Sequence, residues 1–213
     1  MKVSSFTLVP AVRHLLCEAV SSHADFRSLD SIQGVGVDLR YASADNFVGR
    51  ILYGDLDCAW LQREAAAGVE QVVACLQQHH PELKLLVLDA LRPHRVQELL
   101  WQHLEGTELR QYLADPARGS IHSFGMAVDV TLLDASGHEL DMGTGFDDLS
   151  ELSHPDLEEQ HLAQGRLSRE QIANRLMLRN AMCEAGFHGI HSEWWHFDFG
   201  DKELIRQTYQ RVD

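Results

Sequence analysis

Residues 120–134 read SIHSFGMAVDVTLLD, and this stretch does most to decide the fold. Its second part, residues 126–134, reads as a strand. The Ala-Ser-Gly that follows at 135–137 predicts a turn, as in a hairpin. Gly125 stands between the strand and the polar loop before it, and a glycine allows a sharp change of direction there. We therefore expect a strand that is entered from an irregular loop.

Within this stretch, His122 and Asp129 are side chains that could bind a metal. They are seven residues apart, and on one unbroken strand an odd separation puts side chains on opposite faces. A turn at Gly125 removes that obstacle, so His122 can come from the loop and Asp129 from the strand. An aspartate between Val128 and Val130 is also expensive to bury alone, so we expect Asp129 to be paired or metal-bound.

Two further stretches are dense in metal-competent side chains, FDDLSELSH at 146–154 and HSEWWHF at 191–197. Two histidines and one carboxylate from separate segments suit a catalytic zinc site, which uses three protein ligands and leaves a position for water. Glu193 and His196 can reach one metal only if the chain bends or twists around Trp194. Because the chain has 13 histidines, composition alone selects none of them.

Strands occur both with and without intervening helices, which favours an α+β fold over a doubly wound sheet. The longest helix is predicted over 57–80, with Asp57 as its N-cap and Pro81 after its end. The apolar run LKLLVLDA at 83–90 predicts a buried strand. The other expected elements are a helix at 11–20, a strand at 34–41, a helix at 94–104 opened by Pro93, irregular chain at 105–125, a polar loop at 142–156, a helix from a Ser168/Gln171 capping box to Ala185 with Gly186 as its C′ residue, a strand at 191–199 and a short helix from Lys202.

The composition is that of one compact globular domain, with 213 residues of which 45% are hydrophobic and 23% charged. The formal net charge is −14 and no dense basic run occurs, so we expect no binding to nucleic acid. Residues 1–10 lack the apolar run and cleavage site of a secretory signal. No apolar stretch is long enough to span a bilayer. These features predict a cytoplasmic protein with no membrane partner.

The four cysteines, Cys17, Cys58, Cys75 and Cys183, form no C-x-x-C pair, which excludes zinc fingers. Their wide spacing on apolar-rich segments predicts buried thiols in a reducing compartment. None of them has an obvious histidine partner in the sequence. A cysteine hydrolase is therefore the weakest alternative, although the sequence leaves Cys183 open.

Five segments of the chain, in order, resemble signatures of the D-alanyl-D-alanine dipeptidases, the VanX-like branch of the M15 zinc peptidases. SIHSFGMAVDVTL (120–132) matches the family pattern S-x-H-x-x-G-x-A-x-D, and EWWHF (193–197) matches the second signature. DALRP (89–93) matches the arginine motif. VDLRYASADNFVGR (37–50) resembles the N-terminal block, and DMGTGFDDLSELSHP (141–155) the substrate loop. The matches extend over nearly the whole chain.

The resemblance implies a metal site and a mechanism. One zinc ion would be bound by His122, Asp129 and His196. Glu193 would be the catalytic acid/base, and Arg92 would stabilise the transition state. The implied reaction is hydrolysis of free D-alanyl-D-alanine or a related D,D-dipeptide, in the setting of peptidoglycan metabolism.

The resemblance also implies a fold and a substrate pocket. Residues 1–213 would form a single zinc dipeptidase domain with a central antiparallel sheet flanked by helices, and such proteins are often homodimers. Asp147 would receive the ammonium group of the dipeptide, and Ser120 would line the same pocket.

Three residues depart from the family pattern while leaving the ligands and Glu193 intact. They are Ile121, Phe124 and Met126. We expect them to flank the pocket, with Phe124 and Met126 making its far wall bulkier and more apolar, so the accepted dipeptides stay open.

Two alternatives remain beside the dipeptidase. One is a D,D-carboxypeptidase or an L-Ala-D-Glu-type endopeptidase that acts on peptidoglycan peptides, against which the sequence offers no wall-binding repeat. The other is a zinc-binding sensor without catalysis, for which neither Glu193 nor Arg92 would be needed.

Overall fold

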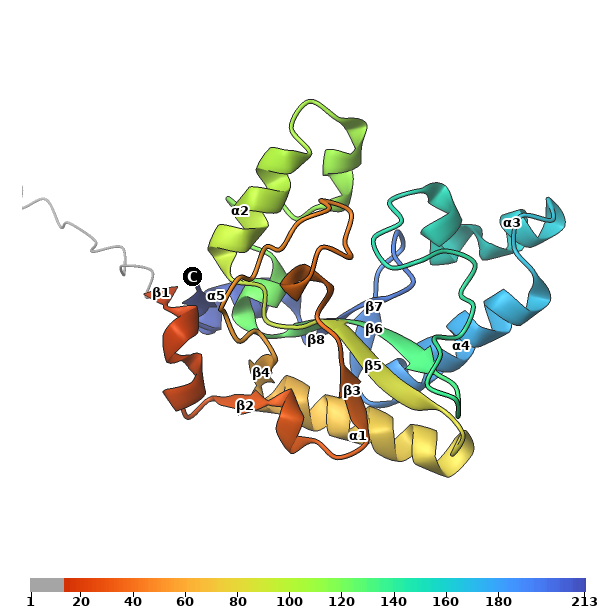
Figure 1. The fold of residues 1–213 in the computed structure, drawn as a ribbon, viewed down its shortest axis with the longest axis horizontal. Helices are drawn as coiled ribbons and strands as arrows, with labels where there is room; N and C mark the ends of the chain where they lie inside the picture. The colour runs from red at the N-terminus through yellow and green to blue at the C-terminus, as the bar shows by residue number, and fades with distance from the viewer. Residues whose placement is uncertain (1–13) are drawn as a thin grey trace, which may run out of the picture.

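The computed structural model describes residues 14–213, and its centre is a five-stranded sheet (Figure 1). Within this sheet, neighbouring strands pair in antiparallel fashion, except that the edge strand β3 runs parallel to β5. The predicted α+β class with a central, mainly antiparallel sheet is confirmed. The strands lie side by side in the order β3 (Val35–Val37), β5 (Lys84–Asp89), β6 (Ala127–Leu133), β8 (His196–Phe199) and β7 (Phe187–Gly189).

Two helices, α1 (Arg63–His79) and α4 (Arg169–Glu184), pack against each other and against the sheet. Their apolar side chains join those of β5, β6 and β8 in the main core. Gly68 lets α1 come very close to the sheet, because a Cβ at this position would lie 2.7 Å from Phe199 and 2.8 Å from Phe187. Within residues 14–213, none of the helices has both the length and the apolar character needed to cross a membrane.

The rest of the chain surrounds this core. In Figure 1, α2 (His94–His103) lies on the side of the sheet away from α1. The remaining elements are the helices α3 (Glu158–Ala163) and α5 (Lys202–Thr208), the strand pairs β1 (His14–Leu15) with β9 (Arg211–Val212) and β2 (Phe26–Ser28) with β4 (Trp60–Gln62), and 3-10 helices at Cys17–Ser22, Leu29–Ser31, Arg40–Ala42, Glu108–Tyr112, Ile121–Phe124, Glu151–Ser153 and Pro155–Leu157.

Several local predictions are confirmed. The buried strand at 83–90 is β5, and the helix after Pro93 is α2. Ser168 and Gln171 form the expected capping box at the start of α4. Gly186 follows the end of that helix with φ +90°, the left-handed conformation expected of a C′ glycine.

Other boundaries were predicted wrongly. The long helix begins at Arg63 rather than at 57, because residues 60–62 pair with β2 as strand β4. Asp57 instead accepts hydrogen bonds from the Ala59 amide and the Trp60 indole. The strands at 34–41 and 191–199 are shorter than predicted. In the region of the predicted helix at 11–20, residues 11–13 lie outside the described chain and the rest includes a 3-10 helix instead.

The cysteines also differ from expectation. Cys17 and Cys58 are buried, but Cys75 is only partly buried and Cys183 is exposed. The sequence shows no obvious histidine partner for a cysteine, but His79 lies one turn after Cys75 on α1, with a ring nitrogen within 4.8 Å of the sulfur.

Candidate metal centre and substrate pocket

Three neighbouring strands bring polar side chains into one row across the sheet. Asp129 of β6 lies opposite Asp89 of β5 on one side and opposite His196 of β8 on the other. The register of β5 shifts between Val87 and Asp89, an irregularity of the kind that re-aims side chains near functional sites. Strand pairing therefore fixes the relative positions of Asp129 and His196.

His122 reaches this row from outside the sheet. It belongs to the 3-10 helix Ile121–Phe124, which ends at Gly125 with φ +68°. A Cβ at position 125 would lie 2.9 Å from the Phe26 ring and 3.2 Å from the Gln62 amide nitrogen. Glycine is thus needed both for the backbone conformation and for the close approach. The turn expected at Gly125 is present, and it brings His122 to Asp129.

The three donor atoms converge at metal-ligand spacing. His122 Nε2 lies 3.1 Å from His196 Nδ1 and 3.4 Å from Asp129 Oδ1. The same Asp129 oxygen lies 2.9 Å from His196 Nδ1. In a tetrahedral site with bonds of about 2.0–2.1 Å, ligand atoms are about 3.3 Å apart. The observed separations of 2.9–3.4 Å are close to this value, so the three residues fit a single metal ion.

Each of the three residues has a second partner that orients it. His122 Nδ1 lies 2.8 Å from the Ala90 carbonyl oxygen, and His196 Nε2 lies 3.1 Å from Asp198 Oδ1. An N–H that donates to either oxygen leaves the other ring nitrogen with its lone pair free to coordinate. The second oxygen of Asp129 accepts a hydrogen bond from Arg92, 3.2 Å away.

The surroundings of the cluster favour a cation. Asp89, Asp129 and Asp198 are all buried within a few residues of one another in the sheet. Burial lowers the pKa of His196, but the Asp198 and Asp129 carboxylates outweigh it and raise that pKa well above its ordinary value. Burying several negative charges together costs free energy, and the positive charge of a bound dication offsets that cost.

Arg92 lies buried just after β5, and three of the five N–H groups of its guanidinium donate to protein acceptors. Its Nε donates to Asp89 at 2.8 Å, one terminal nitrogen donates to Gln97 at 3.0 Å, and the other reaches Asp129. The guanidinium also lies over the Tyr41 ring, 5.0 Å from its centroid. Arg92 therefore holds Asp129 in place while forming part of the pocket wall.

Glu193 lies in the bend that precedes β8, so the change of direction expected around Trp194 is present. Its carboxyl lines the same pocket as His122 and His196. Burial raises the pKa of Glu193 to about 7, with the Asp129 charge adding to the effect. A carboxyl that titrates near neutral pH can both accept and return a proton.

Asp147 adopts φ +61°, the only positive φ of a non-glycine residue within 14–213. Its Oδ1 accepts a hydrogen bond from the Tyr41 hydroxyl at 3.1 Å. Its Oδ2 is buried without a hydrogen-bond partner among the described residues. Burial raises the pKa of this carboxyl well above its usual range, although the charge of Arg92 opposes the shift. A strained, unsatisfied acid at a pocket wall is typical of a ligand contact.

The pocket that these residues share encloses about 130 Å³. Ser120 lines it, and so does Ile121. The prediction that Phe124 and Met126 also form its wall is wrong, because both side chains are buried in the main core and do not reach the cavity. Among the three departures from the family pattern, only Ile121 can touch a ligand there.

Sequence reasoning missed several partners of the site, among them Asp198 and Tyr41. Asp198 could have been found, because it lies two residues after His196 on one strand and such residues share a face. It also forms an ion pair with Lys202 at 2.8 Å. Tyr41 carried no local signal, since its contact with Asp147 joins segments 106 residues apart.

This chain is similar to known dipeptidases over most of its length. The chain is 39% identical to the D-alanyl-D-alanine dipeptidase of Escherichia coli over 76% of its length and 77% of the relative. It is 29% identical to that of Enterococcus faecalis over 84% of this chain and 93% of the relative. The solved structure of the LdcB LD-carboxypeptidase aligns with 87% of this chain and with 72% of the LdcB chain. The two sequences are 15% identical in this alignment, and the TM-score is 0.48, too low to support an argument. The M15 peptidase family described as D-ala-D-ala dipeptidase matches residues 23–213, and the chain therefore belongs to this metal-dependent peptidase family.

Proposed function

We propose that this chain is a zinc dipeptidase that hydrolyses free D-alanyl-D-alanine. The observation that carries the proposal is the convergence of His122, Asp129 and His196 at metal-ligand spacing on one wall of a small pocket. The D-alanyl-D-alanine dipeptidases to which the chain is similar support the choice of substrate. The proposed ligands are His122 Nε2, Asp129 Oδ1 and His196 Nδ1, a nitrogen and carboxylate set that suits zinc.

A zinc ion held there would supply a Lewis acid that polarises the scissile carbonyl and activates a water molecule. Glu193 accepts the proton of the attacking water and donates it to the leaving amine. Its pKa of about 7 supports both steps at neutral pH.

Arg92 is proposed to act at the oxyanion and on the ligand set together. Its buried guanidinium is fixed by Asp89, Gln97 and Asp129, so little reorganisation is needed as charge develops on the substrate. Loss of a donor of this kind costs roughly 3–4 kcal/mol in transition-state stabilisation.

Asp147 is proposed to bind the substrate's ammonium group. The unpartnered Oδ2 supports this role, because a charged N–H donor would satisfy it and favour the ionised carboxylate. The Tyr41 hydroxyl orients the same carboxylate. Ser120, buried at the pocket wall, is proposed to contact the dipeptide as well.

An ammonium site inside the pocket also separates the dipeptidase from its alternatives. A carboxypeptidase or wall endopeptidase must accept a peptide that continues beyond this point, where a neutral amide would replace the charge. A sensor would need neither Glu193 nor the ammonium contact. Neither alternative is favoured by the comparisons.

We further propose that the chain works as a single domain and in the cytoplasm on wall-derived dipeptides, with a homodimer as its oligomeric state. The unbonded Cys17 and Cys58 thiols, with sulfurs 4.0 Å apart, support a reducing compartment. Size-exclusion chromatography with light scattering measures the oligomeric state directly.

The test of the proposed function compares free D-Ala-D-Ala, N-acetyl-D-Ala-D-Ala and L-Ala-L-Ala as substrates for the zinc-loaded protein. The acetylated dipeptide has no ammonium group to pair with Asp147, and removing one partner of a buried ion pair costs about 3–5 kcal/mol. We therefore expect the acetylated dipeptide to be cleaved at least about a hundredfold less efficiently than the free one. Asp147→Asn should raise KM for the free dipeptide and narrow this gap.

Asp148→Asn is the matched control, because this neighbouring acid does not line the pocket. Asparagine tolerates the left-handed conformation of residue 147, so the variant removes charge without adding strain. Equal cleavage of free and capped dipeptides by the unmodified protein would instead support the carboxypeptidase.

A further inference from the structure

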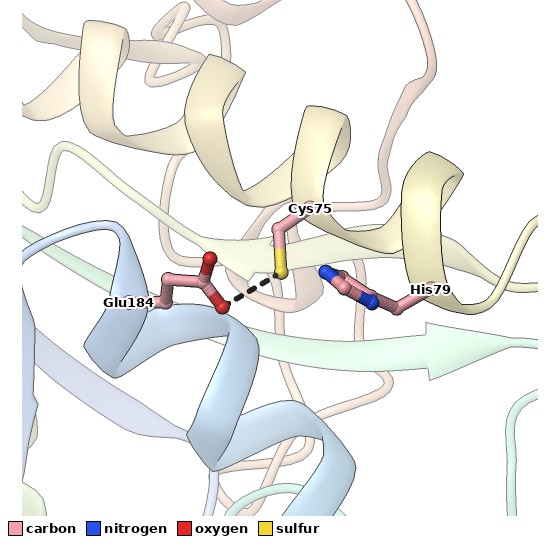
Figure 2. A group of neighbouring side chains, drawn as sticks. All are labelled: Cys75, His79 and Glu184. Carbon is pink, nitrogen blue, oxygen red and sulfur yellow. Dashed lines mark hydrogen bonds between the residues drawn. The ribbon is translucent and has the colours of Figure 1, made fainter.

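A second group of metal-competent side chains lies on the surface where α1 meets α4 (Figure 2). Cys75 and His79 are four residues apart on α1 and therefore share one face of the helix. Glu184 is the last residue of α4. In Figure 2 the three side chains point toward one another across the gap between the helices.

The distances within this group suit a metal ion. Cys75 Sγ lies 3.4 Å from Glu184 Oε2, and one ligand atom from each residue lies within 4.8 Å of the others. A tetrahedral zinc site with a Zn–S bond of about 2.3 Å and a Zn–O bond of about 2.0 Å separates sulfur from oxygen by about 3.5 Å. The sulfur and the oxygen are thus already at this spacing, and a ring nitrogen of the exposed His79 lies within 4.8 Å of both.

We propose that Cys75, His79 and Glu184 form a second site, separate from the catalytic one, for a thiophilic divalent cation of the zinc class. Thiolate, imidazole and carboxylate are three donors that zinc accepts together, with water in the fourth position. The ion would join the C-terminal part of α1 to the C-terminal end of α4.

The position of the group on its helices adds an independent argument. His79 is the last residue of α1 and Glu184 is the last residue of α4. The C-terminal end of a helix carries partial negative charge, so a carboxylate there is unfavourable and a cation is favourable. The last turn of α4 contains no basic residue that could fill this role. A bound dication would therefore supply the positive charge that the last turn of α4 lacks.

A nucleophilic cysteine is the competing explanation for a thiol beside a histidine and an acid. Such a thiol needs its pKa lowered by nearby positive charge. Burial instead raises the pKa of the Cys75 thiol, and the Glu184 carboxylate raises it further. The thiol donates its hydrogen bond to Glu184 and not to His79. A nucleophile would lack the positive charge it needs here, whereas a bound dication would itself supply that charge and stabilise the thiolate.

The second site lies outside the reaction chemistry, because none of its three residues lines the catalytic pocket. Its effect is on stability. A ligand that binds the folded chain and bridges two helices raises the temperature of unfolding as its concentration increases.

Cobalt(II) is the probe that separates the two sites. A cobalt ion bound by a thiolate absorbs in the near ultraviolet through sulfur-to-metal charge transfer, and the three proposed ligands of the catalytic site include no cysteine. We expect the full-length, untagged protein to bind about two cobalt ions and to show this absorption. Cys75→Ser should bind about one ion and lose the absorption, with its circular dichroism spectrum unchanged.

The controls are the neighbouring Cys183→Ser and His80→Ala, which should keep both ions and the absorption. His79→Ala and Glu184→Gln should each weaken binding of the second ion by at least about tenfold. One cobalt ion per unmodified chain without thiolate absorption, or absorption that persists in Cys75→Ser, would overturn the second site.

Discussion

The two metal-competent clusters of this chain have similar donors but different support. In the buried cluster, every donor has a partner behind it: Ala90 behind His122, Asp198 behind His196 and Arg92 behind Asp129. In the surface cluster, Glu184 and His79 are exposed, and the thiol of Cys75 donates its hydrogen bond to Glu184. Strands β6 and β8 and the 3-10 helix before Gly125 position the first set, whereas the second depends on side chains near the ends of two helices.

This difference determines what each cluster can do. Outer partners fix the tautomer and direction of a ligand, and their loss typically costs about 10–100-fold in metal affinity or activity. A site with such partners can hold an ion in one geometry for catalysis. A site without them binds more weakly and suits a stabilising or reversible role. The following variants test this contrast, beginning with the largest expected effect.

His122→Ala removes a ligand of the buried cluster and should abolish hydrolysis of free D-Ala-D-Ala. The loss of activity should exceed the roughly 10–100-fold loss that follows removal of an outer partner, because this variant lacks one of the metal ligands. Zinc per chain, measured by mass spectrometry of the purified protein, should fall by one ion. His138→Ala, at an exposed turn, is the control. Retention of the full zinc content by His122→Ala would show that the ligand assignment is wrong.

Glu193→Gln should lower kcat by about 10²–10⁴-fold while leaving the zinc content unchanged, since this residue moves protons and does not hold the ion. The carboxylate is a base only when ionised, so the rate of the unmodified protein should fall as the pH drops below its pKa. Burial sets that pKa at about 7, and a nearby dication shifts it lower. The acid limb of the kcat profile should therefore lie at or below about pH 7. Near-normal turnover of zinc-loaded Glu193→Gln would exclude this role.

The residues of the buried cluster can be predicted from the sequence because the evidence for them lies in neighbouring residues. The apolar neighbours of Asp129 made an unpaired carboxylate improbable, and Gly125 indicated where the chain must turn. The bend before His196 followed from requiring Glu193 and His196 to meet. Family resemblance then joined segments that periodicity alone could not place together.

What the sequence could not predict depends on contacts between distant segments. The start of α1 was misplaced because residues 60–62 pair with β2, and strand pairing outweighs the helix preference of that region. Phe124 was assigned to the pocket although it turns into the core, because sequence spacing does not tell which side of a 3-10 turn faces inward. The surface cluster was missed for the same reason, since Cys75 and Glu184 are 109 residues apart.

Asp198→Asn should weaken zinc binding by the buried cluster, because it removes the partner behind His196 and so leaves a ligand without outer support, as in the surface cluster. The change keeps the size of the side chain but removes the carboxylate that lies 3.1 Å from His196 and 2.8 Å from Lys202. We expect zinc affinity, measured by competition with a chromophoric chelator, to fall by about 10–100-fold. Asp55→Asn, an exposed change of the same charge, should have no effect. Unchanged zinc affinity in Asp198→Asn would mean that outer partners do not explain why the buried cluster binds metal more tightly than the surface cluster.

Loss of the surface ion alone should have the smallest effect on activity, and graded removal of zinc gives the most direct comparison of the two clusters. As free zinc is lowered in chelator-buffered solutions, the surface ion should leave first, because its ligands lack outer partners. We expect the two ions to leave at free zinc concentrations at least about tenfold apart. Hydrolysis of free D-Ala-D-Ala should stay constant through the first loss and disappear with the second, since Cys75, His79 and Glu184 do not line the pocket. Cys75→Ser should show only the second loss. If activity instead falls in step with the first ion, the more weakly held ion is the catalytic one, and the support behind His122, Asp129 and His196 does not strengthen metal binding.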